Sequence, residues 1–350
     1  MENLTRAALP GAAPVAEPTL TPPSTFPTSR RDTARQLGRI VLQRGVQALV
    51  VAALVGTVSF LMMRLLPGDM AFRIAAGRYG YDMVTAQAAE AVRAELGLGL
   101  PWFESLVAWW GHLLRLDLGV SAVTGAPVAA EIAHQLGHTL ALALAALAVS
   151  CAIAVPLGFA AGLRPRGRLD RLTLWLSVLL RALPPFVLGI VLVAVLAVQL
   201  GLIPAGGDAA HGSLIAPALT LGLGLSATAM RVARDAMVTV TASPYFLFAR
   251  TKGLSDRAAL LRHGVRNAAV PLVAYLGVQL VFLVEGVVVI ETLFAWPGIG
   301  HALVHAIFGR DVPMIQGTAL VMGLLFVALN ALVDLACAGI DPRVRIGRGR

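Results

Sequence analysis

Residues 243–271 read SPYFLFARTKGLSDRAALLRHGVRNAAVP and lie between two long apolar segments. Ser243 suits the N-cap of a helix, Pro244 suits its first position, and Gly253 suits a left-handed stop. Four residues at i, i+3, i+4 and i+7 share one face of this helix: Tyr245, Phe248, Ala249 and Lys252. The pattern predicts a folded helical loop between apolar segments.

The same stretch is strongly cationic. After the stop at Gly253, either Ser255 or Asp256 suits the cap of a second short helix. Five basic residues lie along the two helices: Arg250, Lys252, Arg257, Arg262 and Arg266. We expect such a charged, folded element to dock another molecule. The alternative is an ordinary positively charged cytoplasmic loop.

The composition is that of a membrane protein. The 350 residues are 57% hydrophobic and 13% charged, with a mean hydropathy of +0.78, whereas soluble domains are about one quarter charged. The net charge of +9 does not indicate nucleic-acid binding, because the basic residues cluster between apolar segments. Cys151 and Cys337 both lie inside apolar segments, so we expect neither a disulfide framework nor a zinc motif.

Six apolar segments have roughly the 20 residues that a membrane-crossing helix needs. They cover residues 39–66, 137–162, 172–200, 214–233, 270–292 and 316–338. Pro184 and Pro185 predict a kink in the third. The expected fold class is therefore all-α: a polytopic membrane protein with six transmembrane helices.

The segments between and beyond these helices complete the expected organisation. An extracytoplasmic helical insertion occupies residues 67–136, with an amphipathic helix over 82–96 and three tryptophans at the membrane interface: Trp102, Trp109 and Trp110. Residues 1–38 are rich in Pro, Ala and Thr and are expected to form a disordered tail. Residues 137–340 form the transmembrane core, in which 234–268 is the basic loop, and 341–350 form a second tail.

The distribution of charge predicts the orientation. The N-terminal arm, the 163–171 loop, the 231–268 loop and the C-terminal tail hold 6, 4, 7 and 4 of the 28 Lys and Arg residues. The long 67–136 insertion holds four. Because positive charge is retained on the cytoplasmic side, both termini and the basic loop are expected there.

The basic loop resembles the coupling loop of ABC importer permeases of the dipeptide, oligopeptide and nickel group. The matching residues are Tyr245, Ala249-Arg250-Thr251-Lys252-Gly253-Leu254, Arg262-His263, Arg266-Asn267 and Pro271. Outside the loop, the turns at residues 66–69 (LPGD) and 291–300 (ETLFAWPGIG) and the end at 341–343 (DPR) are also similar. The resemblance covers about residues 40–345 and makes 137–340 an ABC type-1 transmembrane domain.

The resemblance implies a permease subunit of an ATP-driven importer for small peptides, nickel chelates or related solutes, in a bacterial cytoplasmic membrane. The implied partners, besides membrane lipid, are a second homologous permease, two ABC ATPase subunits and an extracytoplasmic solute-binding protein. The implied ATPase-coupling residues are Ser243, Pro244, Tyr245, Phe248, Ala249, Arg250, Lys252 and Gly253. Of these, Tyr245, Phe248 and Ala249 would fill a groove on the ATPase.

No catalytic residues are assigned. A phosphate-binding P-loop needs a Lys followed by Ser or Thr, but the only lysine, Lys252, is followed by Gly253. ATP hydrolysis is therefore expected on a separate subunit that binds ATP and Mg²⁺, with no cofactor on this chain. An exporter subunit, a channel subunit and a scaffold are the alternatives that co-purified partners would distinguish.

Histidines occur in two pairs spaced by one helical turn, at 134/138 and 301/305. The metalloprotease pattern HExxH needs a Glu where Gln135 and Ala302 stand, so an intramembrane metalloenzyme is disfavoured and no metal site is assigned. Six of the seven histidines fall on the expected outer side. Contact with cargo and interhelical hydrogen bonding are the two alternatives for them.

Two ionisable residues lie inside apolar segments, where charge is costly and often functional. They are Glu285 in the fifth segment and Arg181 in the third. We expect them to line the translocation pathway. The alternative is a buried structural pair.

Overall fold

The computed structural model describes residues 30–65, 68–80, 84–95, 101–202 and 214–340. The chain divides into two compact units, residues 1–43 and 44–350. Within the first unit, the structure describes only the beginning of helix α1 (Arg30–Leu65), which starts before the expected residue 39. The expectations for residues 1–29, 82–83, 203–213 and 341–350 lie outside the described residues.

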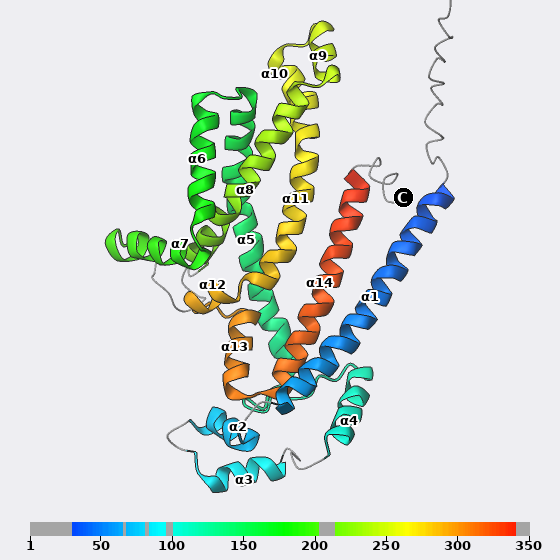
Figure 1. Ribbon diagram of the computed structural model, residues 1–350, viewed down its shortest axis with the longest axis vertical. Coiled ribbons are helices and arrows are strands. Elements are labelled where there is room, and N and C mark those ends of the chain that lie inside the picture. The colour runs from blue at the N-terminus through cyan, green and yellow to red at the C-terminus, as the bar shows by residue number, and fades with distance from the viewer. Residues whose placement is uncertain (1–29, 66–67, 81–83, 96–100, 203–213, 341–350) are drawn as a thin grey trace, which may run out of the picture. The chain divides into compact units, whose positions relative to one another are not determined.

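The described part of the second unit is helical, with one isolated β-bridge between Val120 and Pro127. Its long helices are α5 (Val128–Leu163), α8 (Ile215–Thr241), α11 (Val265–Gly286) and α14 (Val312–Ile340) (Figure 1). With α1, they give five described helices long and apolar enough to cross a membrane, or six if one bent pair is a single crossing. The all-α polytopic fold is therefore confirmed.

The bent pair lies where two prolines predict a kink. Helix α6 (Arg168–Ala182) ends before Pro184, and α7 (Pro185–Leu192) continues into a π-helix, η1 (Val193–Gln199). The two arms meet at 102°, which is far from a straight crossing over residues 172–200. Proline lacks the backbone N–H of a helix interior and clashes with the preceding turn, so two in succession break the helix.

The remaining helices are short and lie at the ends of the long ones. The insertion contains α2 (Met70–Tyr79), α3 (Ala86–Glu95) and α4 (Trp102–Leu114). The basic loop contains α9 (Pro244–Thr251), α10 (Asp256–Ala259) and a π-helix, η3 (Leu260–Gly264). After α11 come α12 (Val288–Leu293) and α13 (Ile299–Gly309), so the expected fifth span ends at Gly286 and not at residue 292.

Small residues bring α5 and α8 into close, parallel contact. A Cβ on Gly222 would lie 2.6 Å from Val149, and one on Gly162 would lie 2.6 Å from the Arg234 carbonyl oxygen. The two helix backbones can approach this closely only because these positions carry no side chain. Gly222, at the start of a run of small residues over 222–227, therefore lies in a packed helix interface.

We expect Gly222→Ala to destabilise the protein by about 1–3 kcal/mol, because its methyl group would overlap Val149. Gly224→Ala, on the same helix, is the matched control, since nothing lies within 4 Å of a Cβ there. Thermal unfolding of the two detergent-solubilised variants measures the difference. Equal unfolding temperatures would show that α5 and α8 are not held in this contact.

Candidate functional site

The basic loop forms a compact helical element beyond the ends of α8 and α11 (Figure 1). Helix α9 begins at Pro244, and Ser243 occupies the N-cap position with extended backbone. The Ser243 hydroxyl donates to the Val240 carbonyl oxygen, so it does not cap α9 as expected. Gly253 has a φ of 88°, in the left-handed region that favours glycine, and so ends the helix as expected. Ser255 then caps α10 by accepting from the Ala258 N–H.

Helix α9 has an exposed face and a buried face. Tyr245 is 44% exposed and Phe248 is 58% exposed, and the Lys252 ammonium lies 4.7 Å from the centroid of the Phe248 ring. These three residues, spaced i, i+3 and i+7, are called the coupling face below. They present two aromatic rings and one positive charge, a combination enriched at protein interfaces.

The opposite face of α9 packs against the chain itself. Phe246 and Ala249 belong to a buried cluster with Met237, Val240, Ala259 and Ala268. Ala249 is 8% exposed, so it lies beneath the coupling face instead of extending it. Its small side chain lets α9 sit close to the end of α8.

A salt bridge joins the two short helices of the loop. The Arg250 Nε lies 2.7 Å from the Asp256 Oδ1, and both side chains are exposed. Arg250 thus has a partner within the loop, whereas Lys252 lies over an aromatic ring. Because α8 extends to Thr241 and α11 begins at Val265, the loop between long helices is shorter than the expected 234–268.

At the opposite end of the helices, a buried carboxylate ties three segments together. Glu291 of α12 is 0% exposed. Its Oε1 accepts from the Thr139 hydroxyl of α5 at 2.5 Å, and its Oε2 accepts from the Gly300 and His301 N–H groups at 2.8 and 3.1 Å. The carboxylate thus satisfies the free N–H groups at the start of α13.

Sequence reasoning did not single out Glu291, although it begins the ETLFAWPGIG turn. The nearest sign of it in the sequence is the glycine at position 298. The structure shows why glycine stands there, because a Cβ on Gly298 would overlap the Glu291 carboxylate. Thr139 completes the arrangement by accepting from the Ile299 N–H at 2.9 Å. Burial raises the pKa of Glu291, because loss of hydration outweighs these donors.

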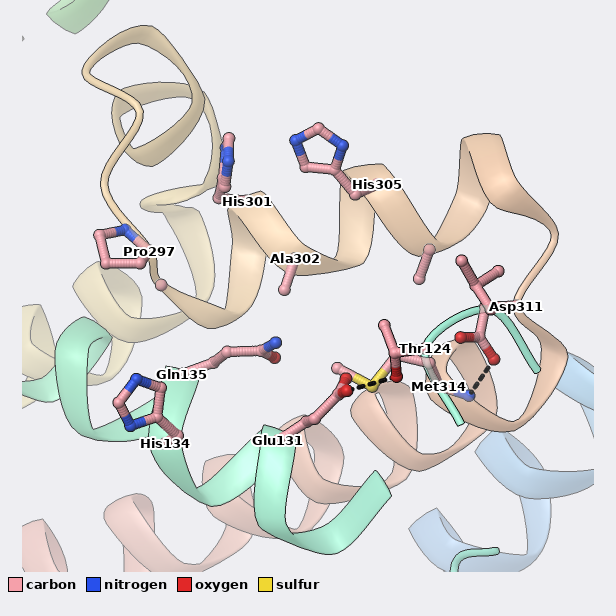
Figure 2. Close-up of a pocket in the computed structure, with 13 residues that line it drawn as sticks. Thr124, Glu131, His134, Gln135, Pro297, His301, Ala302, His305, Asp311 and Met314 are labelled. Atoms are coloured by element: carbon pink, nitrogen blue, oxygen red, sulfur yellow. Dashed lines mark hydrogen bonds between the residues drawn. The ribbon is translucent and has the colours of Figure 1, made fainter. Parts of the chain in front are cut away.

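A cavity of about 350 Å³ lies beside the start of α13, with Pro297, Gly298 and His301 in its lining (Figure 2). In Figure 2, Glu131 and Gln135 of α5 face α13, and Glu131 accepts from the Thr124 hydroxyl at 2.6 Å. Two buried polar atoms, the Gln135 Oε1 and the His301 Nδ1, have no hydrogen-bond partner among the described residues. Burial lowers the pKa of His301, and the neighbouring His305 lowers it further. Gln135 and His301 thus bring polar side chains with unpaired atoms to the wall of the cavity.

The histidine pairs form ring contacts. His134 and His138 have ring centroids 4.8 Å apart, and those of His301 and His305 are 4.6 Å apart. Among the described residues, no group of three or more His, Cys, Asp or Glu side chains is placed to hold a metal ion.

The two residues expected in the translocation pathway are not shown to meet. Arg181 is exposed near the end of α6 and interacts electrostatically with Tyr275 of α11. The side chain of Glu285 lies outside the described residues. The assignment of both residues to the pathway therefore stays a prediction.

Comparison with known proteins places the chain among transport components. The family described as "Binding-protein-dependent transport system inner membrane component" matches residues 154–346. The "Glutathione transport system permease protein GsiC" of Salmonella paratyphi A (strain ATCC 9150 / SARB42) is 35% identical over 305 residues, which are 87% of this chain and 98% of that protein. The "Probable peptide ABC transporter permease protein y4tP" of Sinorhizobium fredii is 35% identical over 317 residues, or 88% and 100% of the two chains.

A solved structure described as "Crystal structure of an amino acid ABC transporter with histidines" has a TM-score of 0.49 and 14% identity. It covers 60% of this chain and 94% of that chain.

Proposed function

Since the chain belongs to the inner-membrane components of binding-protein-dependent transport systems, we propose that it forms one half of a peptide translocation pathway. It is a permease subunit of an ABC importer and a multi-pass inner-membrane protein. The cargo we propose is a short peptide such as glutathione, with nickel chelates as the alternative. The observation that carries this proposal is the end-to-end similarity to glutathione and peptide permeases.

The proposed partners are the other components of a binding-protein-dependent transport system. An ATPase and a binding protein are implied by a binding-protein-dependent ABC system. More finely, we propose a second homologous permease that completes the pathway, and two ATPase subunits that bind ATP and Mg²⁺. The distribution of Lys and Arg supports a cytoplasmic location for both termini and the basic loop.

In the proposed mechanism, α9 acts as a rigid lever. Closure of the ATPase dimer pushes on the coupling face, and the buried contacts of Phe246 and Ala249 pass the movement to α8 and α11. The pathway then switches from inward-facing to outward-facing by rigid-body motion. The lever begins at Ser243 and Pro244 and ends at Gly253. Lys252 contacts acidic groups on the ATPase. Arg250 joins α9 to α10 through its salt bridge with Asp256.

We further propose that cargo passes the outer cavity before it enters the pathway. The Gln135 amide and the His301 imidazole, which line this cavity, would form hydrogen bonds with polar groups of the peptide. We assign Arg181 and Glu285 to the pathway itself, because ionisable residues inside membrane helices usually face a polar route.

Uptake by proteoliposomes tests the proposed cargo. Labelled glutathione and di- to pentapeptides would be offered to the assembled complex with its binding protein. Accumulation of at least one peptide class, competed by the unlabelled peptide, is expected. Accumulation of a nickel chelate but of no peptide would overturn the proposed cargo.

A further inference from the structure

A second cavity, of about 470 Å³, lies between the start of α6 and the later part of α8. It is lined by Arg166, Asp170, Arg171, Leu174, Arg231 and Arg234. Four of its six lining residues are arginines, at the end of the helices where the basic loops lie. The transport mechanism above does not use it.

The carboxylate of Asp170 connects the arginines of the cavity but does not neutralise their total positive charge. Asp170 accepts from the Arg234 guanidinium at 2.8 and 3.0 Å and from the Arg166 backbone N–H at 2.8 Å, with an Arg231 nitrogen 3.8 Å away. Arg234 also pairs with Asp235 at 2.8 Å. Within the described chain, no ion pair is formed by the guanidinium groups of Arg166 or Arg171, so a concentrated positive charge remains.

Helix α6 buries polar side chains and exposes apolar ones, which is the reverse of a surface helix in a soluble protein. Its polar residues Asp170, Thr173 and Ser177 are buried. Starting from Arg171 and continuing at i+3, i+4, i+7 and i+8, its outer face carries four exposed apolar side chains: Leu174, Trp175, Val178 and Leu179. Such a face suits contact with lipid tails.

The basic cavity and this apolar face are continuous, since Arg171 and Leu174 belong to both. We propose that an anionic phospholipid binds here, with its phosphate among Arg166, Arg171 and Arg231 and its acyl chains along Trp175 and Leu179. Basic pockets between membrane helices on the cytoplasmic side are suited to such headgroups. A soluble anion would use the charge but would leave the apolar face uncovered.

Lipid binding to the purified full-length chain, with any subunits that co-purify, tests the proposal. Native mass spectrometry would compare cardiolipin, phosphatidylglycerol and phosphatidylcholine. Brominated phosphatidylglycerol should quench the fluorescence of Trp175, which is 72% exposed, and Trp175→Phe should remove that quenching. Tighter binding of both anionic lipids than of phosphatidylcholine is expected.

The variant Arg166→Ala/Arg171→Ala should weaken anionic-lipid binding about 25-fold, since each removed charge contributes about fivefold. The matched control is Arg164→Ala/Arg168→Ala in the same loop, because neither residue lines the cavity. The control should bind within about twofold of the original chain, because the two charges that it removes lie outside the cavity. Arg171→Lys keeps the charge and should retain binding, which separates charge loss from misfolding.

Four results would overturn the proposal. The first is equal binding of phosphatidylglycerol and phosphatidylcholine, and the second is equal weakening by the two double variants. The third is displacement of the lipid by inorganic phosphate or glycerol phosphate at concentrations similar to those of the lipid, which would indicate a site for a soluble anion. Loss of the ATPase from the Arg166→Ala/Arg171→Ala variant with unchanged lipid binding would identify a protein contact instead.

Discussion

Phe248→Asp should abolish ATP-driven uptake while leaving the chain folded. Phe248 is more than half exposed and supports Lys252, so its loss removes the centre of the coupling face. The substitution would also place a carboxylate in the groove on the ATPase. The binding free energy lost would be comparable to that lost when an interface hot-spot residue is truncated. We expect uptake to fall at least about 30-fold, which corresponds to about 2 kcal/mol or more.

Leu247→Asp is the matched control for Phe248→Asp. Leu247 is 50% exposed and is the adjacent residue, but it points about 100° away around the helix. Uptake by this variant should stay within about threefold of the original, as for contacts outside a hot spot. Equal losses in both variants, or normal uptake by Phe248→Asp, would contradict the lever role of α9.

The second large effect is expected at Glu291. Glu291→Leu leaves the Thr139 hydroxyl and the N–H groups of Gly300 and His301 buried without their acceptor. Each such group costs about 1–3 kcal/mol, so we expect a loss of about 3–5 kcal/mol and a much reduced yield of folded chain. The thermal unfolding midpoint in detergent measures this loss.

Thr292→Ala is the control for Glu291→Leu. Thr292 is the next residue, its side chain is exposed, and its hydroxyl donates to the Val288 carbonyl oxygen within its own helix. Its replacement should change stability by no more than about 0.5 kcal/mol. If Glu291→Leu unfolded at the same temperature as Thr292→Ala, the carboxylate would not be the tie between α5, α12 and α13.

The pH dependence of stability gives a further test of Glu291, which lies outside the membrane-spanning helices. Because burial raises its pKa above the ordinary value of 4.5, the folded chain binds this proton more tightly than the unfolded chain does. The contribution of Glu291 to stability therefore decreases as the pH rises from its unfolded pKa through its folded pKa. Glu291→Gln should remove that part of the pH dependence, and an unchanged pH profile would contradict it.

Much of the fold could be predicted because the bilayer imposes a simple length rule. Five apolar runs correspond to long helices, and the Pro184-Pro185 pair marked the break in the third. The angle of that break could not be read from the chain, because proline removes a hydrogen bond without setting the new direction. The fifth helix ends at Gly286 because the chain turns there to start α12, although the apolar run continues.

The candidate site, like the fold, could be predicted from the sequence only in part. The helical period identified Tyr245, Phe248 and Lys252, which do lie on one exposed face. Ala249 follows Tyr245 by four residues and so has the same helical spacing, but it is buried because it packs against residues of α8, α10 and α11. Glu291 was missed because its partners lie 152 and 9–10 residues away, and contacts between distant residues leave little trace in local patterns.

Co-purification from the native membrane tests the central claim most directly. The full-length chain would be isolated in mild detergent, its partners identified by mass spectrometry, and ATP hydrolysis measured with and without them. The account predicts a P-loop ATPase, a second six-helix permease and an extracytoplasmic binding protein that stimulates hydrolysis. Recovery of the chain without an ATPase, under conditions that preserve other membrane complexes, would contradict it.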